Sequence, residues 1–327
     1  MKKVLLTILL VIVIGILGFG SYLKFALPNV GPAPDLKINA TPAMIEHGKY
    51  LAYHVTVCMD CHSTRNWSLF SGPIIPGTDG KGGEYFDEKE GFPGKFYSKN
   101  LTPFNLSNWT DGEIFRAITT GVAKDGSTMF PVMPYSYYGK MSKEDIYDII
   151  AFIRTLKPID SKSPDHSVNF PVNFILNTIP QKAQLSIKPP VKDTLAYGAY
   201  MINAAGCMEC HTPAKNGNII KSKAFTGGRE FILPGVTIYS ANLTPDVETG
   251  IGAWSEAQFI SRFKAYADKA ELAKVSNNGE QTIMPWSMYA GMDTTDLVSI
   301  FKYLMSLKPV KNEITNHFVV QKTGDNK

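Results

Sequence analysis

The sequence predicts an all-α protein, in which a single N-terminal transmembrane helix precedes a tandem repeat of two small helical domains. Three observations predict this fold. Residues 4–23 form an apolar stretch without a charged side chain, one five-residue motif occurs twice about 150 residues apart, and the segments around both copies match in the same order. The expected boundaries are a membrane anchor at 1–27, a linker at 28–40, domain one at 41–160, an interdomain segment at 161–190, domain two at 191–312 and a tail at 313–327.

The N-terminal segment has the composition of a membrane anchor. Lys2 and Lys3 precede the apolar stretch, and no small-x-small cleavage site follows it. A run of this length spans the hydrocarbon core and exceeds a typical signal-peptide h-region. We therefore expect an uncleaved single-pass anchor in the bacterial cytoplasmic membrane; a signal peptide with a poor cleavage site is the alternative. The paired lysines favour a cytoplasmic leading end, which places the rest of the chain on the periplasmic side.

Each domain is expected to be mostly helical. A first helix runs from about Pro42 into the first motif, and a middle helix starts near Trp109 with Thr110 or Asp111 as its cap. Apolar residues at helical spacing define the last helix of each copy, capped by Ser142 in copy one. The corresponding cap in copy two is Asp293. The matching segments of the two copies are 48–51 with 198–201, 97–103 with 239–245, 109–113 with 254–258, 133–136 with 284–287, and 155–158 with 306–309.

Residues 161–190 separate the copies and contain five prolines. The stretch 169–175 is too apolar for a free linker, so we expect this segment to pack across one or both domains. The tail after about Lys311 is expected to fray.

All four cysteines of the chain lie in the repeated motif, C-x-x-C-H. They are Cys58 and Cys61, followed by His62, and Cys207 and Cys210, followed by His211. This spacing is the attachment signature of c-type haem, in which both thiols bond to the porphyrin and the histidine ligates iron. Four-cysteine zinc sites do not require the histidines, and a thioredoxin-like motif needs no second copy. The sequence therefore predicts two covalently bound haem c groups.

The second axial ligand decides what such an iron does. The methionine candidates form two matched pairs and two unmatched residues: Met133 with Met284, Met141 with Met292, and Met129 and Met288 alone. Met141 and Met292 each precede a helix cap and suit a hydrophobic staple. Met133 and Met284 each precede a loop proline, 71 and 73 residues after the histidines. We favour Met133 and Met284 as iron ligands, with loop packing as the alternative.

Bis-histidine ligation is the competing arrangement, but the spare histidines do not recur at equivalent positions: His47, His54, His166 and His317.

Other matched residues suggest roles around the haem, with core packing and turn formation as equal alternatives. Asn100 and Asn242 are candidates to donate to propionates, Trp109 and Trp254 to line the pocket, and Arg65 to pair with a propionate. Gly48 and Gly198 are candidates for a close approach to the last helix of each copy.

These motifs resemble class I cytochrome c domains, and more closely the multihaem cytochrome c subunits of bacterial membrane-bound alcohol, gluconate and related dehydrogenases. The similarity is carried by the haem motif, the Asn-Leu-Thr-Pro loop, the Trp-led helix and the Met-Pro-aromatic loop, over residues 41–312. It implies two class I cytochrome c-like domains and electron transfer from a dehydrogenase to quinone or a terminal oxidase. Those subunits commonly carry three haems, whereas this chain has two motifs. Copy two also lengthens the segment before its methionine, 267–281, and lacks the Asp125-Gly126 pair of copy one.

The function predicted from the sequence is single-electron transfer between a periplasmic donor and a respiratory acceptor, without a catalytic substrate. The expected partner is a redox protein: a dehydrogenase, an oxidase or another cytochrome. Haem redox enzymes such as a dihaem peroxidase are the alternative, although a matched methionine in both domains argues against an openable iron site. A gas or redox sensor is a third alternative, but no signalling domain is visible in the sequence. The net charge of +4 is spread without a basic block, which gives nucleic-acid binding no support.

Overall fold

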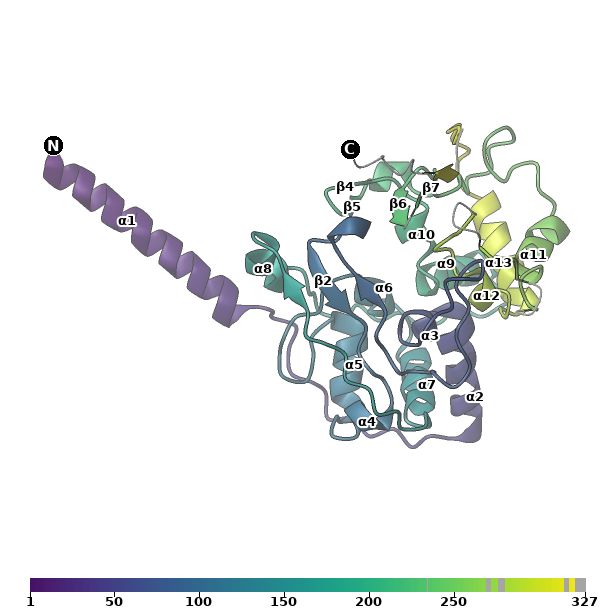
Figure 1. The fold of residues 1–327 in the computed structure, drawn as a ribbon, viewed down its shortest axis with the longest axis horizontal. Coiled ribbons are helices and arrows are strands. Elements are labelled where there is room, and N and C mark those ends of the chain that lie inside the picture. Colours follow the sequence, from purple (N-terminus) through teal and green to yellow (C-terminus); the bar gives the residue numbers. More distant parts are fainter. Residues whose placement is uncertain (234, 269–271, 276–279, 315–317, 321–327) are drawn as a thin grey trace, which may run out of the picture.

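The computed structural model describes the chain except for residues 234, 269–271, 276–279, 315–317 and 321–327. A long apolar helix projects from a body in which the two copies of the repeat lie against each other (Figure 1). This helix, α1 (Lys2–Ser21), continues into a π-helical turn, η1 (Tyr22–Ala26). Together they form the one described helix that is long and apolar enough to cross a membrane, and no residue of α1 is buried against the body.

Copy one consists of helices joined by loops, with two short strands. Its elements are α2 (Pro42–Tyr50), η2 (Leu51–Val55), α3 (Cys58–Cys61), β1 (Tyr85–Phe86), η3 (Glu88–Glu90), β2 (Gly94–Tyr97), α4 (Pro103–Leu106), α5 (Asp111–Thr120), α6 (Tyr135–Tyr138) and α7 (Lys143–Ile153). The interdomain segment adds β3 (Ser167–Val168), α8 (Val172–Ile175) and η4 (Leu176–Thr178).

Copy two repeats this order with its own additions. Its elements are α9 (Thr194–Ala204), α10 (Cys207–Cys210), β4 (Ala214–Lys215), β5 (Asn218–Ile219), η5 (Lys221–Lys223), β6 (Glu230–Leu233), β7 (Val236–Tyr239), α11 (Glu256–Lys264), α12 (Trp286–Tyr289), α13 (Thr294–Met305) and β8 (Phe318–Val320). β8 lies in the predicted tail and pairs antiparallel with β7. The expectation of an unstructured tail is therefore wrong for these three residues.

The predicted cap residues stand at the helix starts, although the side chain of Asp293 makes no capping hydrogen bond at α13. Thr110 accepts from the backbone N–H of Glu113, whose carboxylate accepts from the N–H of Thr110, a complete capping box at the start of α5. Ser255 and Gln258 form the same box at α11. Ser142 caps α7, as predicted.

The first and last helices of each copy pack closely because a glycine faces the crossing point. A Cβ on Gly48 would lie 1.8 Å from the carbonyl oxygen of Asp148 in α7, and one on Gly198 would lie 2.1 Å from that of Ser299 in α13. The prediction of a close approach at these two glycines is confirmed. One apolar core runs through both copies and includes the buried Met141 and Met292.

The expected all-α fold is wrong, since the described residues form three antiparallel sheets and the fold is mixed α and β. Their strand orders are β1-β2-β3, β4-β5 and β6-β7-β8. The strands are two to four residues long, too short to show alternation within Gly- and Pro-rich loops. β6 and β7 are nevertheless rich in the β-branched and aromatic residues that strands favour.

The interdomain segment packs on copy one. β3 pairs with β2, and the backbone N–H groups of Gln184 and Ser186 donate to the carbonyls of Gly139 and Met141. Lys188 forms an ion pair with Asp145 at 3.1 Å. The segment therefore packs against the turn between α6 and α7 and the start of α7, which follow the Met-Pro-aromatic loop of copy one.

Two equivalent tyrosines join the copies reciprocally. The Tyr50 hydroxyl, from copy one, donates to Asp296 at the start of α13 and accepts from the N–H of Asp293. Tyr200, its counterpart in copy two, donates to Asp145 at the start of α7 and accepts from the N–H of Ser142. Burial and the adjacent carboxylates raise the pKa of both hydroxyls, which keeps them protonated as donors.

Candidate functional site

Each C-x-x-C-H motif forms one helical turn started by a left-handed residue. Val57 has φ of 46° before α3, and Gly206 has φ of 66° before α10. The backbone N–H of His62 donates to the carbonyl of Cys58 at 3.0 Å, and His211 bonds Cys207 in the same way. One closed turn thus brings both thiols and the histidine of each motif together.

The histidine rings are oriented by backbone carbonyls. The Nδ1–H of His62 donates to the carbonyl of Lys99 at 2.7 Å, and that of His211 donates to Ala241 at 2.8 Å. A carbonyl only accepts, so Nδ1 carries the proton and Nε2 keeps a free lone pair. Burial lowers the pKa of both imidazoles, although the carbonyl bonds raise it. Two neutral rings with a free Nε2 are the form that binds a metal.

The four thiols are partly buried and form no disulfide. Burial raises the pKa of all four, to about 12 for Cys207 and about 11 for Cys210. Reactive cysteines have lowered values. These thiols therefore do not have the environment of a catalytic nucleophile.

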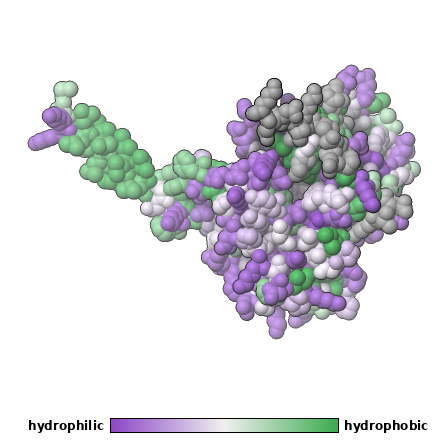
Figure 2. All heavy atoms as spheres, in the orientation of Figure 1, coloured by the Kyte–Doolittle hydropathy of each residue, from purple (hydrophilic) through white to green (hydrophobic). Residues whose placement is uncertain are grey.

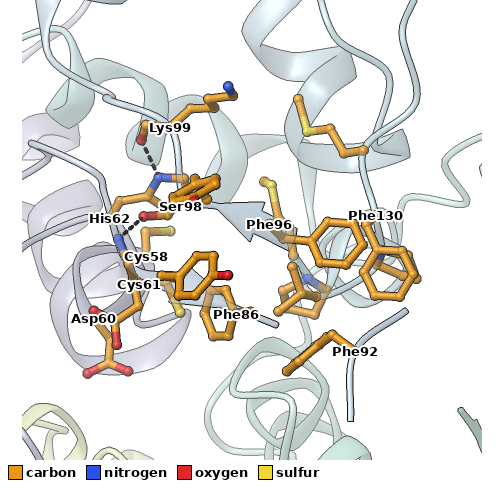
Figure 3. A pocket seen from close by; sticks show the side chains of 18 of the residues that line it. Cys58, Asp60, Cys61, His62, Phe86, Phe92, Phe96, Ser98, Lys99 and Phe130 are labelled. Atoms are coloured by element: carbon orange, nitrogen blue, oxygen red, sulfur yellow. Dashed lines mark hydrogen bonds between the residues drawn. The ribbon is translucent and has the colours of Figure 1, made fainter. Parts of the chain in front are cut away.

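A cavity of about 3130 Å³ lies against the first motif and extends between the copies. Cys58, Cys61 and His62 line one wall, and Figure 3 shows Phe92, Phe96 and Phe130 across from them, with Phe86 nearer the motif. Ligand sites are typically about 300–1,000 Å³. This cavity is several times larger, and phenylalanine side chains line part of its wall, which suits a large flat cofactor.

The predicted methionine ligands lie differently in the two copies. Met133 lines the cavity together with the first motif, and so does Met129, which lacks a counterpart in copy two. In copy two the cavity wall includes Cys210 and the neighbours of Met284, Ile283 and Pro285. Among the described residues, the structure therefore brings the predicted ligand set of copy one to one cavity, but only Cys210 from that of copy two.

The spare histidines separate into two groups. His47 bonds Asp148 at 2.7 Å, and Nδ1 of His54 bonds the carbonyl of Met288 at 2.8 Å. His166 lines the cavity and stacks on Phe96. His317 lies outside the described residues. Among the described spare histidines, His166 alone lines the cavity, whereas His47 and His54, which lie closer to the first motif in the sequence, do not.

Comparison with known proteins gives several relatives, although no protein-family model matches the chain. The cytochrome c subunit of a quinone-linked alcohol dehydrogenase from Gluconacetobacter polyoxogenes is 28% identical over 289 residues, covering 83% of this chain and 58% of the relative. The fructose dehydrogenase cytochrome subunit of Gluconobacter japonicus is 27% identical, covering 86% and 56%. The gluconate 2-dehydrogenase cytochrome c subunit of Pantoea cypripedii is 26% identical, covering 88% and 65%.

The chain is similar to dehydrogenase cytochrome c subunits. The predicted resemblance is therefore confirmed, and it supports an electron-transfer cytochrome that carries haem c. The chain spans less than two thirds of the length of these relatives. The residues of copy one fit such a group, since two thiols, a free Nε2 and an aromatic wall face one cavity.

Each motif lies beside charged residues, of which the sequence pattern singled out only Arg65. In copy one the Asp60 carboxylate pairs with buried Arg65 at 3.0 Å, and Glu84 lies on the same cavity wall. Burial raises the pKa of Asp60 to about 6 and of Glu84 to about 7, although Arg65 lowers both. In copy two Arg229 pairs with Glu209 at 2.6 Å. Aligning the copies on their Gly-Gly pairs, 82–83 and 227–228, would have shown that Arg229 replaces Glu84.

Three suggested roles around the cofactor are not supported. The side-chain amides of Asn100 and Asn242 donate to backbone carbonyls that follow the last helices, while their oxygens accept from Thr102 and Thr244. Arg65 donates to the carbonyls of Ser71 and Gly72 besides pairing with Asp60. These groups stabilise loops. Trp109 lines the cavity as expected, whereas Trp254 is not part of its described wall.

Proposed function

We propose that this chain is a membrane-anchored dihaem cytochrome c that carries single electrons between a periplasmic donor, a dehydrogenase, and a respiratory acceptor. Cys58 and Cys61 would hold one haem covalently, and Cys207 and Cys210 the other. His62 and His211 would each offer Nε2 to iron, with Met133 and Met284 as second ligands. A haem with both axial positions filled accepts and releases one electron with little rearrangement, and a thioether ligand raises its potential.

One observation carries the proposal: both motifs present the same neutral imidazole. Each Nδ1–H is held by a carbonyl about 30–40 residues further along the chain, Lys99 for His62 and Ala241 for His211. This bond fixes the ring and raises the basicity of Nε2. Chance C-x-x-C-H sequences would not share it.

The dehydrogenase donor is proposed from the names of the relatives, and the location from α1. The relatives are subunits of dehydrogenases. An uncleaved α1 would hold both copies at the periplasmic membrane surface, close to membrane-bound partners.

The test is a haem count on the full chain, made in cells with a c-type maturation system. The wild type is expected to carry two haems per chain by the pyridine haemochrome assay, and each serine double variant, Cys58/Cys61 or Cys207/Cys210, to carry one. Each variant is the control for the other. A wild-type ratio of one or zero would reject the dihaem proposal.

The ligands and the enzyme alternative are tested on the same samples. The oxidised protein is expected to show the weak red iron–methionine charge-transfer band, reduced in Met133→Ala and in Met284→Ala and retained in Met129→Leu. A spectrum unchanged in both alanine variants would reject these ligands. Carbon monoxide binding to the reduced wild type, or rapid oxidation of a donor by peroxide, would instead support a haem redox enzyme.

A further inference from the structure

We infer that the interdomain segment around α8 forms a second membrane contact, which lies on the lipid surface beside the end of α1. This inference rests on the proposed anchoring of α1. The contact surface consists of Phe170, Phe174 and Ile175, and we call it the α8 patch.

The α8 patch is apolar and open. Phe170 is 78% exposed, Phe174 57% and Ile175 47%. The two phenylalanine rings pack edge to face, with centroids 6.2 Å apart. No charged residue occurs between residues 167 and 181. A cluster of exposed large apolar side chains indicates a binding surface rather than ordinary protein surface.

The α8 patch is fixed beside the point where the anchor ends. α8 and η4 both contact η1, and the side-chain amide of Asn177 donates to the carbonyl of Leu23 at 3.2 Å. Leu23 is buried, whereas Phe25 is 80% exposed. Figure 1 shows α8 next to the inner end of α1, and Figure 2 shows the apolar surface of the helix continuing onto the body there.

This position favours lipid over a protein partner. A membrane that surrounds α1 must have its surface near η1, which is the level of the α8 patch. Exposed phenylalanine and leucine side chains are typical of segments that lie in the interface, and they need no charge complementarity. Tyr22, 55% exposed, stands at the same level, where tyrosine is enriched in membrane proteins.

The contact would orient the body. β3 joins the α8 patch to β2 of copy one, and Val172 and Ile175 also line the cavity of the first motif. Two attachment points, α1 and the α8 patch, would stop the body from rotating about a single linker. Copy one would then lie nearer the bilayer than copy two.

Photocrosslinking in the full chain tests the inference. Benzoyl-phenylalanine replaces Leu10, Phe174 or Val247, one at a time, in protein reconstituted in phosphatidylcholine nanodiscs. Val247 is 68% exposed and belongs to the segment between β7 and α11, two elements that Figure 1 shows on the side of the body away from α1. Lipid adducts are expected at 10 and 174, with a yield at 174 several-fold above that at 247. Phe170→Ser is expected to lower the yield at 174, and Phe170→Leu to keep it.

The outcomes separate the contact from the anchor. Adducts at 10 but not above background at 174 would overturn the second contact and leave the anchor. Adducts at 174 without any at 10 would overturn the anchor and keep the contact, and adducts at neither would overturn both. A crosslink from 174 to a second copy of the chain would overturn the lipid contact in favour of a protein interface.

Discussion

The two copies share the hydrogen bonds that orient their histidines but differ in the charges beside them. Both rings donate to a backbone carbonyl. In each copy a tyrosine also fixes the backbone just before the motif: Tyr138 donates to the carbonyl of Thr56, and Tyr289 donates to that of Ala205. In copy one, by contrast, two carboxylates accompany one guanidinium, whereas copy two has one of each. The repeat thus keeps a common frame for the iron ligand and varies the local electrostatics, which tune a haem potential.

The copies also depend on each other unequally. The loop after the first motif supports the methionine loop of copy two, since Ser71 donates to the carbonyl of Met284 at 2.8 Å. In copy one the corresponding region is held by Asn203 of copy two, which donates to the carbonyl of Tyr137, and also by the interdomain segment, which bonds Gly139 and Met141. Substitutions in both copies test where the equivalence of the copies ends.

The largest effect is expected at the crossing of the first and last helices, which both copies share. Gly48→Ala and Gly198→Ala each place a Cβ against a helix carbonyl that cannot move aside. Each is expected to lower the free energy of unfolding by about 3 kcal/mol. Denaturant titration followed by circular dichroism measures it, with exposed Lys49→Ala as the control in the same helix. A cost in one copy only would break the equivalence of the two helix crossings.

Gln281→Ala tests the unequal support. The Gln281 amide donates to the carbonyls of Trp67 and Leu69 and accepts from the N–H groups of Ser71 and Thr282. Because the substitution leaves the buried N–H groups of Ser71 and Thr282 without their acceptor, we expect the free energy of unfolding to fall by about 2 kcal/mol.

Gln281→Ala should also weaken the iron–methionine charge-transfer band of the haem of copy two, while the band of copy one stays unchanged. The variant is therefore combined with each cysteine double variant, so that one haem is observed at a time, and exposed Gln181→Ala serves as the control. Equal weakening in both copies would contradict the support described for Met284.

Much of this arrangement is visible in the sequence and part of it is not. The motifs and the helices that follow Ser142 and Asp293 were predictable because capping residues and helical periodicity are local signals. The short strands were not, since two to four residues show no period. Contacts such as Ser71 with Met284 join residues more than 200 positions apart and leave no local pattern. The tautomer of His62 likewise depends on a carbonyl that only the folded chain brings near.

A smaller effect is expected at the left-handed residues. Gly206→Val introduces the residue that copy one already has at Val57, and should cost about 1–2 kcal/mol, because β-branched residues disfavour positive φ. Val57→Gly relieves that strain but loses packing against the core, so a net change under about 1 kcal/mol is expected. Unfolding free energies of both variants measure the difference. A large loss in Val57→Gly would show that packing, rather than conformation, selects valine in copy one.

The smallest expected effect concerns the charges. Since burial raises the pKa of Glu84 from 4.5 to about 7, the folded state holds a proton that the unfolded state has released between these values. Stability therefore falls as pH rises through this window, and Glu84→Gln should flatten the fall. Trp67→Phe, which removes the indole donor to Glu84, should instead move the window slightly upward. A slope unchanged in Glu84→Gln would assign it to other groups.

The same charges should separate the two haem potentials. Above about pH 8, where Glu84 is ionised, Glu84→Gln should raise the potential of the haem of copy one by an amount on the order of tens of millivolts. Arg229→Gln, which leaves Glu209 without its cation, should lower that of copy two. Redox titration of the single-haem cysteine variants measures each potential separately. Near pH 5 the Glu84→Gln effect should disappear because the wild-type side chain is already neutral, and an effect that persists there would show that the charge of Glu84 is not its cause.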